Sequence, residues 1–502
     1  MASVTTSLEA SVEATLSTLG AETQQRLAQP FTIFRVPAYI REGKRTAYEP
    51  RMVSIGPYYH GAAGLRAMED HKWLYLHDLL FVRNTAVSSS LLIQEMRSLE
   101  PRARACYSER PLLGSDDFVR MLLLDGCFIL EFFFKWYDKV PDALCDVGWG
   151  LTLVNADLLL LENQIPFFVV ERLYGAIAGA QGGTREHLFK ILFNYIGDEK
   201  QTTAEPPSDT IEIHHLLHMY YESFVPKRPP PESEKKTTTP SATLKVIPRA
   251  TEMSAAGVSF VRRSAPHAQD KYDVAFNAGR GVMEIPVMVV DDVERSLLIN
   301  LIAFEQSQGG DDAGVVTSYV SLMGMLVRTP QDVELLRRRG ILDNMLADDE
   351  EAAQFFSHLG DVGTINYDRQ VFSGLCEDVQ RYCDSWWHRN RAALRRDYFS
   401  SPWSAISFVV AGLVVALAAT QTSRRIANQP LAKIVSSKRA EVLLMQRFDG
   451  VPALEGPSEA DKKMVADYFD ANFSIKYMEA TRELFLSLRS NRPAEAAARR
   501  DG

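Results

Sequence analysis

The chain has 502 residues, of which 46% are hydrophobic and 24% charged, and its formal net charge is −9. This composition is typical of a folded chain long enough for two or three domains, and it excludes a chain dominated by disorder. The charge is spread without a long basic block, so the sequence gives no indication of a nucleic-acid-binding surface.

Cysteine usage and the N-terminus both favour a main domain that faces a reducing compartment. The five cysteines form no CxxC pair, and their odd number leaves a disulfide framework incomplete. The N-terminus carries Glu9 and Glu13 before any basic residue and has no continuous apolar core, so a cleaved secretory signal is not expected. We expect residues 1–26 to be a disordered or loosely helical leader.

Residues 27–224 are predicted to be the helical first part of a large globular domain. Their apolar runs are long, with carboxylates only at isolated positions, as in packed helices. The runs are MEDHKWLYLHDLL, FVRMLLLDGCFILEFFFKWY and ADLLLLENQIPFFVVERLY. Residues 225–243, VPKRPPPESEKKTTTPSAT, then lack apolar periodicity and predict a mobile linker or surface insertion.

Residues 244–397 are predicted to form the second part of the domain, with short strands followed by helices. The expected strands lie around Val258–Val261, Tyr272–Phe276 and Met283–Val290, and the expected helices are Val293–Gln306, Thr317–Val327 and Pro330–Arg338. Apolar residues from Phe372 to Trp386 recur at steps of three and four and predict a further helix. The predicted fold class is mainly α, as an α+β domain with a few short strands in its second half, without a βαβ series.

A long uncharged segment from Tyr398 to Ser423 predicts one C-terminal transmembrane helix over residues 402–423. Its centre, AISFVVAGLVVALAAT, is with its flanks long enough to cross a hydrocarbon core about 30 Å thick. The residues taken as the transmembrane anchor are Trp403, Phe408, Val415 and Leu417. The alternative is a buried core helix rich in small residues, although a core helix is rarely uncharged for so long.

The charges around this helix leave its orientation open, because basic residues flank both ends. The missing signal peptide favours a cytosolic main domain with residues 424–502 translocated, whereas the basic charge of that tail opposes this topology. Asn472 opens the sequence NFS and is the candidate glycosylation site of the tail.

Metal and cofactor chemistry has little support in the sequence, which contains no GxGxxG, P-loop, GxSxG or HExxH motif. His214 and His218 have the spacing of two metal ligands on one helical face, but a third ligand is not identifiable nearby. The alternative is a pair of surface histidines that bind local carbonyls or carboxylates. The acidic clusters at 291–292 and 348–351 are interpreted as helix starts rather than cation sites. We therefore expect no metal and no cofactor.

A polar triplet, Glu162, Asn163 and Gln164, interrupts an apolar segment that is predicted to be helical. Buried polar groups need hydrogen bonds, so with Asp125 the triplet is predicted to form a polar network that fixes the packing of two central helices. The alternative is acid–base catalysis by a carboxylate pair in an apolar pocket. The candidate acid–base residues are Asp125, Glu131, Glu162 and His60.

The segment YEPRMVSIGPYYHG, residues 48–61, combines prolines, glycines and tyrosines and is too rigid for a simple linker. It has two interpretations. It could be a ligand-binding loop, or it could be a turn whose tyrosines pack at the edge of the core. We favour the structural interpretation.

Taken together, these segments resemble the plant-specific family called domain of unknown function 247, also known as UPF 0481 proteins. The matching segments occur in the order of the family and span about residues 30–423. They are FTIFRVPAYI, YEPRMVSIGPYYHG, LRAMEDHKWLYLHDLL, LLLDGCFILEFF, LLLLENQIPFFVVERLY, RATEMSAAGVSF, NLIAFEQ, DVELLRRRGILDNML and YFSSPWSAIS.

The resemblance implies one membrane helix near the C-terminus and no established activity, cofactor or catalytic residue. Some grass members are implicated genetically in self-incompatibility, which would fit a recognition role. Members usually stop shortly after the membrane helix, so residues 424–502, which are partly helical by their pattern, depart from the family.

The sequence leads to the hypothesis of a single-pass protein of the plasma membrane or an endomembrane that acts as a protein-recognition or scaffold module without catalytic activity. Its expected partners are the lipid bilayer and another protein, with no nucleic acid. Self-association through the anchor is a weaker alternative, and the rival hypothesis is a membrane-anchored enzyme that uses the buried carboxylates.

Overall fold

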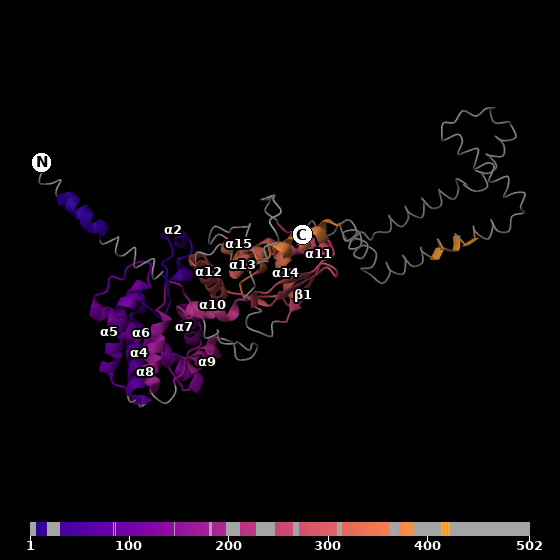
Figure 1. Ribbon diagram of the computed structural model, residues 1–502. Coiled ribbons are helices and arrows are strands. Elements are labelled where there is room, and N and C mark those ends of the chain that lie inside the picture. Colours follow the sequence, from indigo (N-terminus) through magenta and orange to yellow (C-terminus); the bar gives the residue numbers. More distant parts are fainter. Residues whose placement is uncertain are drawn as a thin grey trace, which may run out of the picture. The chain divides into compact units, whose positions relative to one another are not determined.

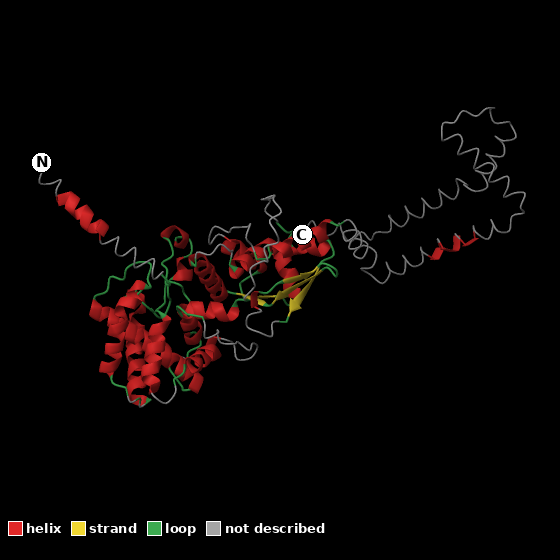
Figure 2. Ribbon diagram, viewed as in Figure 1, coloured by secondary structure: helices red, strands yellow, loops and turns green. Residues whose placement is uncertain are grey.

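The computed structural model describes residues 7–17, 31–83, 85, 87–144, 146–179, 183–196, 211–226, 246–264, 271–308, 314–360, 371–385, 413–414, 416–418 and 420–421. The chain divides into two units, Met1–Ala393 and Leu394–Gly502. Helices dominate the described residues, and the short strands all lie in the second half of the chain (Figure 2). The predicted mainly α class is therefore confirmed.

The first half of the domain is a group of helices around α6 (Ser115–Asp138), which is apolar on every face and buried along most of its length. α4 (Arg66–His77), α5 (Ser89–Ala105), α8 (Phe167–Ala178) and α9 (Arg185–Ile196) pack against it (Figure 1). The shorter elements are α2 (Ala38–Arg41), α3 (Arg45–Tyr48), the 3-10 helix η1 (Ala63–Leu65), the π-helical turn η2 (Asp78–Val82), α7 (Gly150–Leu158) and α10 (Leu216–Phe224).

The second half contains two small sheets and six helices among the described residues. In the first sheet, β3 (Val282–Pro286) pairs in parallel with β1 (Ser259–Arg263) and antiparallel with β2 (Ala275–Asn277). In the second sheet, β4 (Met288–Val290) pairs in parallel with β5 (Leu342–Asn344). The helices are α11 (Ala250–Ala255), α12 (Asp292–Ser307), α13 (Val315–Leu326), α14 (Pro330–Arg338), α15 (Asp349–Gly360) and α16 (Ser373–Asp384).

The predicted strand Met283–Val290 was wrong in one respect, because it is two strands that belong to different sheets. Pro286 ends β3, where its missing N–H removes a donor from the ladder. The chain resumes with Met288, whose N–H donates to the carbonyl of Ile341 at 2.9 Å. The partner strand β5 was not predicted, since three residues are too few to show an alternating pattern.

The acidic residues at the starts of helices act as caps, as predicted. The carboxylate of Asp291 accepts a hydrogen bond from the N–H of Glu294 at 2.6 Å at the start of α12. The carboxylate of Asp348 accepts from the N–H of Glu351 at 2.8 Å at the start of α15. These bonds satisfy N–H groups that have no partner within the helix.

Glu305, near the end of α12, joins this helix to the next one. Its carboxylate accepts from the N–H groups of Val316 and Thr317 at 2.8 Å each, and from the hydroxyl of Tyr221 in α10 at 2.8 Å. A Cβ at residue 314 would overlap the Glu305 carboxylate, so a larger residue there would displace this carboxylate from its present position. One buried carboxylate therefore positions α10, α12 and α13 together.

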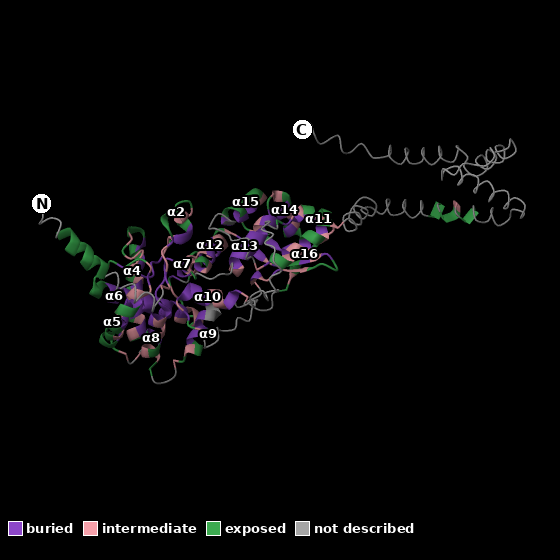
Figure 3. Cartoon of the chain, turned by 45° about the horizontal axis from the view of Figure 1, so that its top comes forward, coloured by how far each residue is buried: buried purple, intermediate pink, exposed green. Residues whose placement is uncertain are grey.

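One hydrophobic core contains residues from both halves of the domain (Figure 3). α12 from the second half packs against α3, α7 and α10 from the first half. The predicted linker 225–243 lies outside the described residues from residue 227 onward, so its character remains a prediction.

Most of the predicted anchor lies outside the described residues, including Trp403, Phe408 and Val415. Leu417 is described, as part of a helical stretch in which its side chain is exposed. No helix within the described ranges combines the length and the apolar character that a membrane crossing requires. The tail 424–502, with Asn472, is outside the described residues as well.

Candidate functional site

The segment Arg51–Gly56 runs without a strand partner, and buried side chains bind its backbone instead. Asp157 takes the first three N–H groups: its Oδ1 accepts from Arg51 at 2.9 Å, and its Oδ2 accepts from Met52 at 2.6 Å and Val53 at 2.8 Å. Burial raises the pKa of Asp157 to about 6, and these backbone donors act in the opposite direction.

Asn163 and Asp125 complete the set of partners for this segment. The Asn163 Oδ1 accepts from the N–H of Ile55 at 2.7 Å, and its Nδ2 donates to the carbonyl of Val53 at 3.0 Å. The Asp125 Oδ2 accepts from the N–H of Gly56 at 2.7 Å. Side chains from two distant parts of the chain thus replace the neighbouring strand of a sheet.

The predicted helix through Glu162, Asn163 and Gln164 was wrong, because these residues lie in a loop between α7 and α8. We call residues 159–164, which follow α7, the polar loop. Its own side chains bind the carbonyls at the end of α7: Gln164 Nε2 donates to Leu158 and Leu160 at 2.7 Å each. These bonds compete with helix continuation, and Pro166 disfavours helical backbone in the residue before it.

The polar loop also binds two elements that follow it in sequence. Gln164 Oε1 accepts from the N–H of Leu216 at 3.0 Å, at the start of α10. Asn300 of α12 accepts from the N–H of Leu161 at 2.8 Å and donates to the carbonyl of Ala47 at 2.7 Å. Asp125, Glu162, Asn163 and Gln164, the residues of the predicted network, are all buried.

Asp125 is held by a buried cation, Lys72 of α4. The Lys72 Nζ lies 2.6 Å from Asp125 Oδ1 and 2.6 Å from Glu69 Oε1, and it donates to the carbonyl of Ser54 at 2.7 Å. Burial alone would lower the pKa of Lys72, but the two carboxylates hold it above its usual value. Lys72 therefore remains charged and neutralises the buried site.

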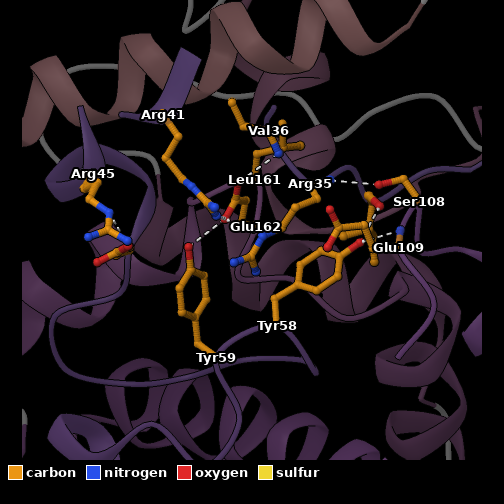
Figure 4. Close-up of polar contacts among 12 residues, drawn as sticks. Arg35, Val36, Arg41, Arg45, Tyr58, Tyr59, Ser108, Glu109, Leu161 and Glu162 are labelled. Carbon is orange, nitrogen blue, oxygen red and sulfur yellow. Dashed lines mark hydrogen bonds and ion pairs between the residues drawn. The ribbon is translucent and has the colours of Figure 1, made fainter. Parts of the chain in front are cut away.

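Glu162 forms a separate cluster near the surface, together with Arg35, Arg41 and Tyr59 (Figure 4). Its Oε1 accepts from the N–H of Val36 at 2.8 Å. Its Oε2 accepts from the Tyr59 hydroxyl at 2.6 Å and from Arg41 Nη1 at 3.2 Å, and it lies 3.4 Å from Arg35 Nε. Burial and then the bond to Glu162 raise the pKa of Tyr59, so the phenol stays protonated at neutral pH.

This cluster is suited to holding its own parts together. The guanidinium of Arg35 lies over the Tyr59 ring at 5.1 Å and over the Tyr58 ring at 5.0 Å. The carboxylate is engaged on both oxygens and the phenol is a donor, so the arrangement has no activated nucleophile. Two guanidinium groups beside one carboxylate leave a local excess of positive charge.

The four candidate acid–base residues are not brought together by the described contacts. Asp125 pairs with Lys72, whereas Glu131 pairs with Arg83, whose Nε lies 2.6 Å from Glu131 Oε2. Glu162 belongs to the cluster of Figure 4. Within the described ranges, no contact joins His60 to any of these carboxylates.

The histidines at 214–218 do not share a helical face as predicted, because His214 precedes α10. His215 caps that helix: its Nδ1 accepts from the N–H of His218 at 3.2 Å, and its Nε2 lies 3.0 Å from the carbonyl oxygen of Thr32. His218 Nε2 lies 3.6 Å from Glu222 Oε1. In the described part of the chain, no group of three or more His, Cys, Asp or Glu side chains could hold a metal ion.

Comparison with known proteins places this structure in a family. The model of the DUF247 family, described as plant protein of unknown function, matches residues 33–417. The chain belongs to this family. The resemblance inferred from the sequence is thereby confirmed.

Two curated relatives of this DUF247 protein come from Arabidopsis thaliana. A UPF0481 protein is 29% identical over 418 residues, covering 78% of this chain and 85% of the relative. A putative UPF0481 protein is 23% identical over 484 residues, covering 78% of this chain and 89% of the relative. No solved structure matches the chain.

Asp157 and the two arginines of the Glu162 cluster were not predicted from the sequence. Asp157 lies in the last turn of α7 and precedes four leucines. A carboxylate in such a position indicates burial with hydrogen-bond partners, but the sequence does not identify those partners. Arg35 and Arg41 lie more than a hundred residues from Glu162 in sequence. A single sequence contains no local signal for such a pairing.

Gly56 is expected to be essential for the fold. Its φ is +81°, and an added Cβ would overlap the carbonyl oxygen of Gln164 in the polar loop. Gly56→Ala should lower the free energy of unfolding by about 1–3 kcal/mol. Gly175→Ala in α8 is the matched control, because it meets no atom within 4 Å and should be neutral or stabilising by up to about 1 kcal/mol. Urea unfolding of both variants tests this, and equal effects would contradict it.

His215 is expected to make stability depend on pH. Burial, and then the neighbouring His218 and His214, lower its pKa well below the ordinary value of 6.5. As pH falls below about 6.5, the unfolded chain binds a proton that the folded chain rejects, so up to about 1.4 kcal/mol of stability is lost per pH unit. His215→Asn keeps a capping side chain but lacks this titration. The stability difference between the two proteins should shrink from pH 7.5 to pH 5, and a constant difference would refute the assignment.

Proposed function

We propose that this DUF247 protein is a single-pass membrane protein whose helical domain recognises another protein and performs no chemistry of its own. Two features support the proposal: the uncharged segment near the C-terminus and an exposed apolar surface on the domain. The membrane is the plasma membrane or an endomembrane. By family resemblance, the role extends to plant cell recognition, such as grass self-incompatibility.

The membrane part of the proposal rests on the uncharged sequence from Tyr398 to Ser423. Within it, the described residues Leu413, Val414 and Leu417 are helical, and their side chains are exposed by 58%, 55% and 61%. The hydroxyl of Thr420 donates to the carbonyl of Ala416 at 3.0 Å, so this polar group finds its partner within the helix. A helix that exposes leucine and valine side chains, and whose Thr420 hydroxyl is hydrogen-bonded within the helix, is suited to contact with lipid.

The observation that carries the recognition role is the exposed apolar face of α4 and η2. We define this face by Trp73, Leu74, Phe81 and Val82, which are exposed by 51%, 57%, 70% and 69%. The His77 ring lies 5.1 Å from the Phe81 ring on the same surface. Clustered exposed aromatic and aliphatic side chains typically mark a protein-binding surface.

The contacts of the buried carboxylates favour binding over catalysis. Asp125, Glu131 and Glu162 each pair with a different cation, Lys72, Arg83 and the two arginines of Figure 4 respectively. A catalytic carboxylate pair requires two such groups to share one site. Among the described residues, the candidate carboxylates of the membrane-anchored enzyme therefore do not converge on one site, and the two carboxylates that do meet, Asp125 and Glu69, are both paired with Lys72.

The anchor is expected to fail when charge is placed at its centre. Val415→Arg with Leu417→Arg should release the protein from membranes, since each arginine opposes insertion by about 2.5–3.5 kcal/mol. Val415→Leu with Leu417→Val is the control and should remain in the pellet. Alkaline carbonate extraction of membranes from plant cells measures this. Release of both proteins, or of neither, would contradict a single span at 402–423.

The apolar face is expected to determine which proteins lie next to the domain. Trp73→Asp with Phe81→Asp should remove a specific set of neighbours from proximity labelling in plant cells, because both central side chains of the face are lost. Leu112→Asp changes another exposed apolar residue, 98% exposed, and should leave the labelled set unchanged. An unchanged set in the double variant would refute recognition through this face.

A further inference from the structure

We infer that the helix formed by residues 7–17 docks in cis on the apolar face of α4 and η2. The inference rests on the proposed function, because the docked helix covers the surface proposed to receive the partner protein. The N-terminal helix would then act as a built-in competitor that the partner must displace. The docking is inferred from two apolar surfaces that are both exposed among the described residues of one chain.

The N-terminal helix has a narrow apolar stripe. Leu8, Val12 and Leu16 follow one another at four-residue steps and therefore lie on one side of the helix. They are exposed by 66%, 49% and 61%. A helix this short is marginal in water when it is alone, so it gains stability by packing its stripe against another surface.

The apolar face of α4 and η2 has matching dimensions. Trp73 and Phe81 are separated by the same number of residues as Leu8 and Leu16, which corresponds to about 12 Å along a helix. Rows of side chains at four-residue steps pack into the grooves between such rows on a facing helix. Trp73 and Phe81 supply the large rings that typically contribute most to a small interface.

Charges at the edge of the two surfaces suit this pairing. Glu9 and Glu13 lie beside the apolar stripe of the N-terminal helix. Arg66 is exposed at the start of α4 and can pair with one of these carboxylates, whereas His77, in the middle of the face, already lies 3.6 Å from Asp78 through its Nδ1. Asp70 is the like-charged group on the same side of α4 and disfavours placing a glutamate at its turn.

The connection between the two surfaces is long enough for docking within one molecule. Residues 18–30 could span up to about 43 Å at about 3.3 Å per residue. The radius of gyration of a domain of this size is about 20 Å. A tether of this length gives an effective concentration in the millimolar range, which favours the helix of the same chain over that of a second copy.

Photo-cross-linking of the full chain in detergent micelles tests the inference. A photoreactive phenylalanine analogue replaces Val12 on the stripe, and in a control protein it replaces Ala10 on the opposite side of the helix. We expect the Val12 probe to give a product of monomer mass, with the cross-link mapped by mass spectrometry to residues 66–82. The Ala10 probe should give at least about tenfold less of this product. Trp73→Asp with Phe81→Asp should reduce the yield of the Val12 probe by a similar factor, whereas Leu112→Asp should leave it unchanged.

Other products would overturn the inference. A cross-linked product of dimer mass would assign the face to the helix of a second copy, and cross-links to detergent or to other parts of the domain would mean that the helix has another target. The proposed function is judged separately by proximity labelling. If the cross-link fails while Trp73→Asp with Phe81→Asp still loses its neighbours, only the cis docking is refuted. If the cross-link forms while the labelled neighbours do not change, the recognition role of the face is refuted instead.

Discussion

The fold depends on how the backbone of Arg51–Gly56 is satisfied. Val53–Gly56 lie in the interior without a neighbouring strand, and a buried N–H or carbonyl without a partner costs about 1–3 kcal/mol. Asp157, Asn163, Asp125 and Lys72 supply the missing partners. Because these side chains come from α4, α6, the end of α7 and the polar loop, the same bonds that satisfy the segment also fix those elements relative to one another.

The polar loop extends this arrangement to the second half of the domain. Its side chains and backbone bind α10 through Gln164 and α12 through Asn300. Glu162 binds Val36 and keeps two arginines and a tyrosine near the surface. The polar residues in the apolar segment LLLLENQIPFF therefore have a structural explanation, and none of their described contacts requires a catalytic one.

The sequence predicted the parts of the fold that have a local signal. Pro330–Arg338 matches α14, because proline at the first position and the Thr329–Asp332 capping box define its start. Burial of Glu162–Gln164 was also predictable, since polar residues inside an apolar run need partners. Their loop conformation was not, because it depends on residues such as Ile55 and Val36, which are distant in sequence. The pairing of β4 with β5 likewise joins short segments whose sequences carry no alternation.

Hydrogen exchange of the backbone amides of residues 51–56 tests the central claim most directly. If buried side chains bind these amides as the structure shows, Met52, Val53 and Ile55 should exchange as slowly as the amides in the middle of α6, although they belong to no helix or sheet. Asp157→Ala should then speed the exchange of Met52 and Val53 more than that of α6. Fast exchange of these amides in the unaltered protein would contradict the account.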